Sequence, residues 1–155
     1  MTTPHQEMCA LFARIKEAHD GHDFDLKKLL PILERFLTVI QSRPRDRDAF
    51  AKEFVSLVAS IDYADQPRGI FAAEHIIDFC MRTLQWPEVG VALKEQYDRE
   101  PRSAVKLWIE RMIREIYDRH WEGGVAELEP QESIWDLLRQ PQPDEPQPAG
   151  DEINS

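Results

Sequence analysis

The sequence predicts an all-α fold, a compact bundle of six to seven helices around a central hydrophobic helix at about 67–86. Apolar side chains recur at steps of three and four along most of residues 1–124, which is the spacing of one helix face. No Asn-Gly or Asp-Gly turn joins two segments that alternate between apolar and polar residues, so no β-hairpin is expected. The 155 residues therefore suggest one helical domain, 1–124, followed by a disordered acidic, proline-rich tail, 125–155.

The first helix has a recognisable start and end. Thr3 offers an N-cap, Pro4 takes the first helical position, and Gln6 stands three residues after the cap, as in a capping box. Asp20-Gly21 should end the helix, because glycine readily adopts the left-handed conformation found after helix C-termini. The face expected to be buried consists of Met8, Leu11, Phe12, Ile15 and Ala18.

The second and third helices follow from the same rules. Asp23 or Asp25 should cap the second helix, whose apolar residues recur from Leu26 to Ile40. Pro31 interrupts this pattern, so either the helix is kinked there or it begins nearer to Leu30. A short charged connection, 42–48, then supplies an aspartate to cap a third helix.

The central segment, 66–86, is apolar on nearly every side of a helical wheel, and such a helix belongs inside a bundle. Pro87 should begin a short fifth helix, and Pro101 repeats that device before a sixth helix at about 102–121. The sixth helix is expected to bury Trp108 in its apolar face and to end at Gly123-Gly124.

The charge of the chain is unevenly distributed. The formal net charge is −10, of which the last thirty residues contribute −7, so the body carries only −3 and nucleic-acid binding is not expected. The start of the chain does not resemble a secretory signal, and no apolar stretch is long enough to span a membrane. Cys9 and Cys80 both fall at helical core positions and are interpreted as reduced thiols. We therefore expect a cytoplasmic protein without membrane partners.

Four polar residues share one narrow strip of the central helix: Glu74, His75, Asp78 and Arg82. The first hypothesis is that the strip faces water or bridges to a neighbouring helix, with Asp78 and Arg82 forming a pair four residues apart. The second hypothesis is acid–base chemistry, in a metal-dependent enzyme that uses Glu74, His75 and Asp78. His5 and Cys9 are also spaced four apart, as two metal ligands on one helix can be, but no third ligand is evident. We expect no catalytic residue, cofactor or metal.

Large side chains at helix ends and in the tail are the candidates for protein binding. Pairs such as Trp86 with Tyr97, or Trp121 with Tyr117, could border a binding surface, although they could instead cover the rim of the core. The tail contains one apolar cluster, at 131–139, that could form a short helix and present part of its face to a groove. This segment packs either on the protein's own body or the same groove of a symmetry mate, or on a different protein. Its apolar residues are Ile134, Trp135, Leu137 and Leu138.

The sequence thus favours a non-catalytic protein-binding protein. The leading hypothesis is an inhibitor or immunity-type partner that binds and neutralises a cognate bacterial protein, such as a toxin or enzyme. The alternative is an adaptor or chaperone-like homodimer that recruits a client through 134–138. The metal-dependent enzyme remains the second alternative.

Overall fold

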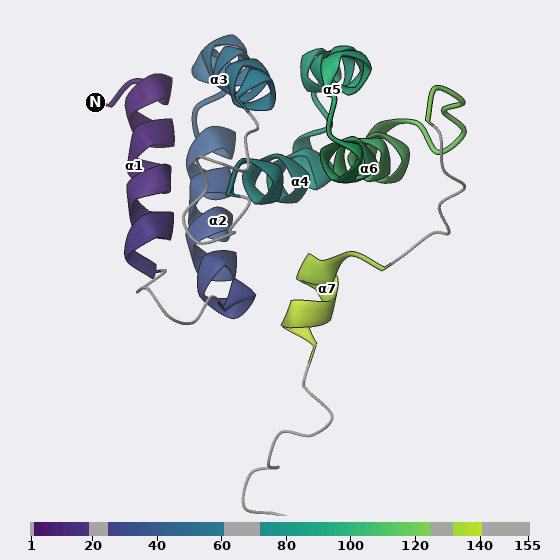
Figure 1. The fold of residues 1–155 in the computed structure, drawn as a ribbon. Coiled ribbons are helices and arrows are strands. Elements are labelled where there is room, and N and C mark those ends of the chain that lie inside the picture. The colour runs from purple at the N-terminus through teal and green to yellow at the C-terminus, as the bar shows by residue number, and fades with distance from the viewer. Residues whose placement is uncertain (1, 19–24, 61–71, 125–131, 141–155) are drawn as a thin grey trace, which may run out of the picture.

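The computed structural model describes residues 2–18, 25–60, 72–124 and 132–140, and every regular element among them is helical (Figure 1). This confirms the all-α prediction. In chain order the elements are α1 (Pro4–Ala18), α2 (Leu26–Gln41), the 3-10 turn η1 (Pro44–Asp46), α3 (Arg47–Ala59), α4 (Ala72–Leu84), α5 (Pro87–Arg99), α6 (Ser103–Met112), the π-helical turn η4 (Ile113–Tyr117) and α7 (Ile134–Arg139).

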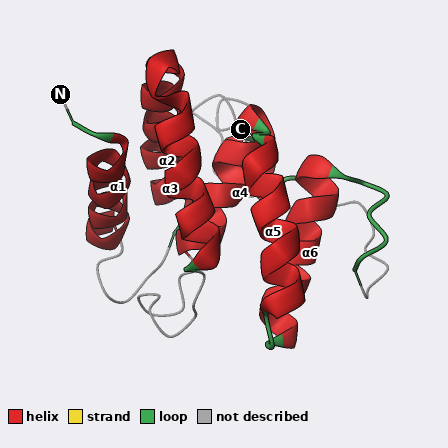
Figure 2. Cartoon of the chain, turned by 90° about the horizontal axis from the view of Figure 1, so that it is seen from above, coloured by secondary structure: helices red, strands yellow, loops and turns green. Residues whose placement is uncertain are grey.

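The helices pack in two layers beside an α1–α2 pair. Helices α3 and α5 lie together on one side of α4 and α6, while α7 lies on the opposite side (Figure 1). The perpendicular view shows α3 and α5 crossing above α4 and α6 (Figure 2). Helix α4 is thus enclosed by helices from both halves of the chain.

Burial of α4 confirms the prediction of a central hydrophobic helix. Every side chain from Ala72 to Met81 is buried, so this helix has no face toward water along its first ten residues. The start expected near residue 67 lies outside the described residues. The helix ends at Leu84, and the next residue, Gln85, has a φ of 48°, the left-handed conformation that commonly follows a helix.

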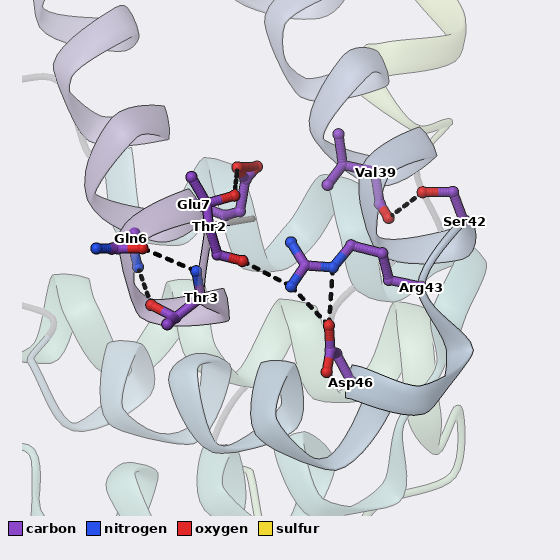
Figure 3. Close-up of polar contacts among 8 residues, drawn as sticks. All are labelled: Thr2, Thr3, Gln6, Glu7, Val39, Ser42, Arg43 and Asp46. Carbon is purple, nitrogen blue, oxygen red and sulfur yellow. Dashed lines mark hydrogen bonds and ion pairs between the residues drawn. The ribbon is translucent and has the colours of Figure 1, made fainter.

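The predicted capping box at the first helix is present. The Thr3 hydroxyl accepts a hydrogen bond from the Gln6 backbone N–H at 3.1 Å, and the Gln6 side chain accepts one from the Thr3 N–H at 2.9 Å (Figure 3). The same close-up shows Arg43 donating to the Thr2 carbonyl at 2.7 Å and pairing with Asp46. These bonds fasten the start of α1 to the α2–α3 connection.

The second helix begins where Asp25 caps it, with its carboxylate accepting from the Lys27 N–H at 2.9 Å. Pro31 lies inside the helix, so the alternative start near Leu30 is wrong.

Several expected core positions are not fully buried: Phe12 and Ala18 are half-buried, and Cys9 and Trp108 are exposed. Cys9 is exposed, because α1 buries the face formed by Met8, Leu11 and Ile15, and Cys9 lies about 100° around the helix from Met8. Trp108 is 36% exposed, because α6 turns Val105, Ile109 and Met112 toward the core instead.

The sixth helix is shorter than predicted and changes its winding. Regular α-helix ends at Met112, and η4 follows as a π-helical turn in which the Asp118 N–H bonds to the Ile113 carbonyl at 2.8 Å. One extra residue in that turn shifts the phase of the side chains after it. Helical structure stops at Tyr117, so the prediction that the sixth helix continues to Trp121 is wrong.

Candidate functional site

The polar strip of α4 is buried rather than exposed. Glu74 is 1% exposed, and His75 and Asp78 are each 9% exposed. The hypothesis of a strip facing water is therefore wrong for these three residues. His75 and Asp78 are covered in part by Trp135 of α7, a segment more than fifty residues further along the chain, and His75 also by Trp108 of α6.

Trp135 attaches α7 to α4. Its side chain is 1% exposed, and its indole N–H donates to the Asp78 carboxylate at 2.8 Å. The indole also makes edge-on contacts with His75, at a ring-centroid distance of 5.7 Å, and with Phe79, at 5.3 Å. Ser133 caps the short helix by accepting from the Trp135 backbone N–H. The tail segment therefore packs on the body of its own chain, as the first of the two hypotheses expected.

The exposed face of α7 differs from the one expected. The sequence suggested that Ile134, Leu137 and Leu138 would enter a groove, but the structure buries Trp135 and leaves Ile134 42% and Leu137 43% exposed. Leu138 is half-buried against the core. The difference arises because the indole combines the largest apolar surface in the segment with an N–H group that Asp78 can accept.

Arg82 completes a polar bridge between α4 and η4. Its guanidinium contacts the Asp78 carboxylate at 2.9 Å and the Glu115 carboxylate at 2.7 Å. Asp78 thus accepts from both Arg82 and Trp135, and both of its oxygens have a donor. At Arg82 the strip therefore bridges to a neighbouring helix, which was one of the two arrangements expected from the sequence.

Burial shifts the two remaining members of the strip in opposite directions. Desolvation raises the pKa of Glu74 to about 7, although its backbone hydrogen bond and the charge of Arg102 act against that shift. Desolvation lowers the pKa of His75 to about 4, opposed by the charge of Asp78. His75 also packs edge-on against Trp108 at a centroid distance of 5.9 Å, so its imidazole lies between two indoles.

This geometry does not support the metal-dependent enzyme. Asp78 is already bonded to Arg82 and Trp135, and His75 lies between tryptophan rings. Within the described ranges, no group of three His, Cys, Asp or Glu residues is placed to hold a metal ion. We do not propose this activity further.

The aromatic residues at the helix ends pair differently from either expected pair. Tyr97 packs edge-on against Trp121 at a centroid distance of 5.0 Å, while the Tyr117 hydroxyl donates to the Trp86 carbonyl at 2.9 Å. Trp86 is 8% exposed and Tyr97 is 3% exposed. These residues contribute to the core and its rim, which was the alternative to a binding surface in the sequence analysis.

A cleft lies between α6 and α7, above the buried strip. It encloses about 370 Å³, and its apolar side is formed by Leu107, Trp108 and Ile134, which are 41%, 36% and 42% exposed. Arg82, Arg111 and Glu115 supply polar groups. Arg111 Nη1 is buried without a hydrogen-bond partner, 3.8 Å from Glu115 Oε1.

Ile134, Arg82 and Asp78, which the sequence suggested as binding residues, line this cleft, whereas Leu107 and Arg111 were not among the candidates. Leu107 stands outside the apolar stripe expected for the sixth helix, and because Trp108 beside it was expected to be buried, no signal in the sequence indicated an exposed apolar pair. Arg111 is one of several charged residues on that helix, and nothing in its local sequence distinguishes it from the others. Neither could be assigned to a cleft without knowing where α7 docks.

In the part of the chain that is described, no helix has the length and apolar character needed to cross a membrane. Comparison with known proteins finds no matching family model, no similar curated protein and no similar solved structure.

Proposed function

We propose that this chain acts by binding another protein, and that the cleft between α6 and α7 is the docking surface. The observation that carries the proposal is the grouping of Leu107, Trp108 and Ile134 around one cleft while all three remain substantially exposed. Apolar side chains scattered singly over a surface need no explanation, whereas a group that lines a groove is typical of recognition sites.

The chemistry of the cleft favours an amphipathic helix as the occupant. Aliphatic or aromatic side chains of the partner would pack on Leu107, Trp108 and Ile134. A carboxylate beside them would lie near the guanidinium of Arg111, whose side chain lines the cleft and is 31% exposed. We therefore propose a partner helix with two or three apolar residues and one acidic residue on the same face.

Inhibition of the partner is the specific role that we propose, in keeping with the inhibitor or immunity-type function expected from the sequence. Support comes from the anchoring of α7 through Trp135, which holds one wall of the cleft in place before binding. A rigid wall reduces the ordering cost of association and so favours a stable complex.

The homodimer is a second candidate because Leu137, 43% exposed on α7, extends the apolar surface beyond the cleft. A symmetric dimer through α7 would bury Ile134 and Leu137 of both copies. Sedimentation velocity separates the two candidates: a monomer at micromolar concentration supports the binding of a different protein, and a dimer that Leu137→Asp dissociates supports self-association.

Affinity purification from the native host tests the binding of a different protein. The wild-type chain should recover one stoichiometric partner, and Leu107→Asp and Arg111→Ala should each lose it. The matched control is Val91→Asp, which changes a 57% exposed apolar residue on α5 that does not line the cleft. This control should retain the partner.

The recovered protein is then titrated in purified form. Tenfold or greater weakening by Leu107→Asp, with little change for Val91→Asp, is expected from the loss of a buried apolar contact. Loss of the partner's own activity on binding would support inhibition. Recovery of no stoichiometric partner, or equal binding by all variants, would overturn the proposal.

A further inference from the structure

A second group of reactive side chains lies on the opposite part of the molecule, where α1 packs against α3. His5 and Cys9 are one helical turn apart on α1, and Glu53 projects from α3. His5 Nδ1 lies 2.7 Å from Glu53 Oε1, and His5 Nε2 lies 3.5 Å from Cys9 Sγ. Carboxylate, imidazole and thiol thus form a continuous chain of hydrogen bonds.

Glu53 determines which ring nitrogen of His5 carries the hydrogen. An ionised carboxylate only accepts hydrogen bonds, so the hydrogen between these groups belongs to Nδ1. In the neutral imidazole the lone pair is then on Nε2, the nitrogen that faces Cys9. The Cys9 thiol accordingly donates to Nε2, in the order of acid, base and nucleophile found in catalytic triads.

The thiol is open to solvent. Cys9 is exposed, and the His5 side chain is 73% exposed, whereas Glu53 is only 22% exposed and is held by the packing of α3. Cys80 provides the contrast within the same chain. It is fully buried in α4, and its surroundings raise the pKa of its thiol by desolvation, so it should be inert in the folded protein.

We propose that Cys9 is a nucleophilic thiol activated by His5 and Glu53, and that it is a modification site for low-molecular-weight disulfides. His5 Nε2 takes the thiol proton, and the Cys9 thiolate attacks one sulfur of the disulfide. A new S–S bond forms as the old one breaks, and the departing thiolate takes up the proton from His5. Cys9 is oxidised to a mixed disulfide and the departing sulfur is reduced, so the disulfide is the only oxidant needed.

The reaction of the full-length chain with 5,5′-dithiobis(2-nitrobenzoate), in the presence of EDTA, tests this assignment. Near pH 7, His5→Gln should react about five- to tenfold more slowly than the wild-type chain, because a thiol without a base is only a few per cent ionised there. Glu53→Gln should fall between the two. The difference should shrink at about pH 10, where hydroxide ionises the thiol without assistance.

Three controls accompany these variants. His120→Gln removes an exposed histidine whose backbone N–H donates to Asp118, outside the His5–Cys9–Glu53 group, and should react like the wild type. Cys9→Ser should show no fast reaction until urea exposes Cys80. Incubation with glutathione disulfide, followed by intact-mass measurement, should add one glutathione to the wild-type chain and none to Cys9→Ser.

Equal rates for the wild type and His5→Gln near pH 7 would overturn the proposal, as would a fast reaction that persists in Cys9→Ser. Circular dichroism checks that the variants are folded; His5 and Cys9 lie at exposed positions, and Glu53 is partly buried. This test is independent of the α6–α7 cleft, so its outcome does not bear on the proposed function.

Discussion

The indole N–H of Trp135 donates to the carboxylate of Asp78 across 57 positions of the chain, at 2.8 Å. This bond joins the short helix α7 to the buried centre of α4. Together with the edge-on contact between Trp135 and His75, it covers two polar residues of a central helix, each of which is 9% exposed.

Removal of the Trp135 side chain should destabilise the fold strongly. Trp135→Ala leaves a cavity and removes a donor from Asp78, which we expect to cost about 3–5 kcal/mol. Trp135→Phe retains most of the edge-on packing and should cost only about 1–2 kcal/mol, since Asp78 keeps Arg82. Urea unfolding followed by circular dichroism measures both. Trp108→Ala, at a 36% exposed position, is the matched control and should cost less than Trp135→Ala; equal costs would contradict the anchoring role of Trp135.

Glu74 should make the folded state less stable as the pH rises. Its pKa is raised from 4.5 to about 7, so its stabilising contribution is complete below the unfolded value and is lost as the pH rises through about 7. The shift corresponds to roughly 3 kcal/mol. Glu74→Gln removes this dependence, so the variant should gain stability relative to the wild type between about pH 4 and about pH 8. A difference between the two chains that is constant with pH would contradict the shift.

His75 should act in the opposite direction. Its pKa is lowered from 6.5 to about 4, so its contribution is complete above the unfolded value and is lost as the pH falls through about 4. His75→Phe keeps an aromatic ring between Trp108 and Trp135 and removes the titration. The variant should therefore be more resistant to acid than the wild type, as measured by urea unfolding at a series of pH values. Parallel stability curves for the two chains would show that His75 is not buried in its neutral form.

The effects of these adjacent residues should largely cancel in the wild-type protein. Between about pH 4.5 and 6.5, Glu74 lowers stability with rising pH while His75 raises it, each by about 1.4 kcal/mol per pH unit. Each single substitution should therefore expose the slope due to the other residue.

Substitution of Gly124 should disturb a buried carboxylate. A Cβ at this position would lie 2.5 Å from Glu110 Oε1, and Glu110 is fully buried with the Tyr97 hydroxyl donating to it at 3.3 Å. Gly124→Ala should cost about 1–3 kcal/mol in urea unfolding. The shorter side chain of Glu110→Asp should relieve part of this clash, so the double variant should be more stable than the sum of the two single effects predicts. Strict additivity would argue against the contact.

Local signals explain what could be predicted from the sequence. Thr3 and Gln6 form a capping box within four residues, and Pro87 begins α5 at the first helical position, so neighbouring residues suffice to identify both starts. The apolar composition around α4 likewise indicated its burial directly.

The remaining features depend on contacts between distant segments. His75 and Asp78 resemble any exposed polar pair until Trp135 of α7 is placed against them, and the partner of Arg82, Glu115, lies in the π-helical turn. No periodicity rule foresees one extra residue in a helical turn, and none assigns Leu107 and Ile134 to the two walls of one cleft. Because α7 forms one wall of the cleft, the cleft cannot be predicted without knowing where α7 packs.

Because α7 belongs to the same chain, Trp135 occupies its buried site against α4 without the need for a second molecule. A covalently attached segment has a local effective concentration at its binding site that a free ligand has to match. A peptide that carries a tryptophan for this site must therefore compete with Trp135 of the same chain, which remains close to the site after it dissociates, even where the two affinities are equal. Only ligands that use the neighbouring surface of Leu107 and Trp108 avoid that competition.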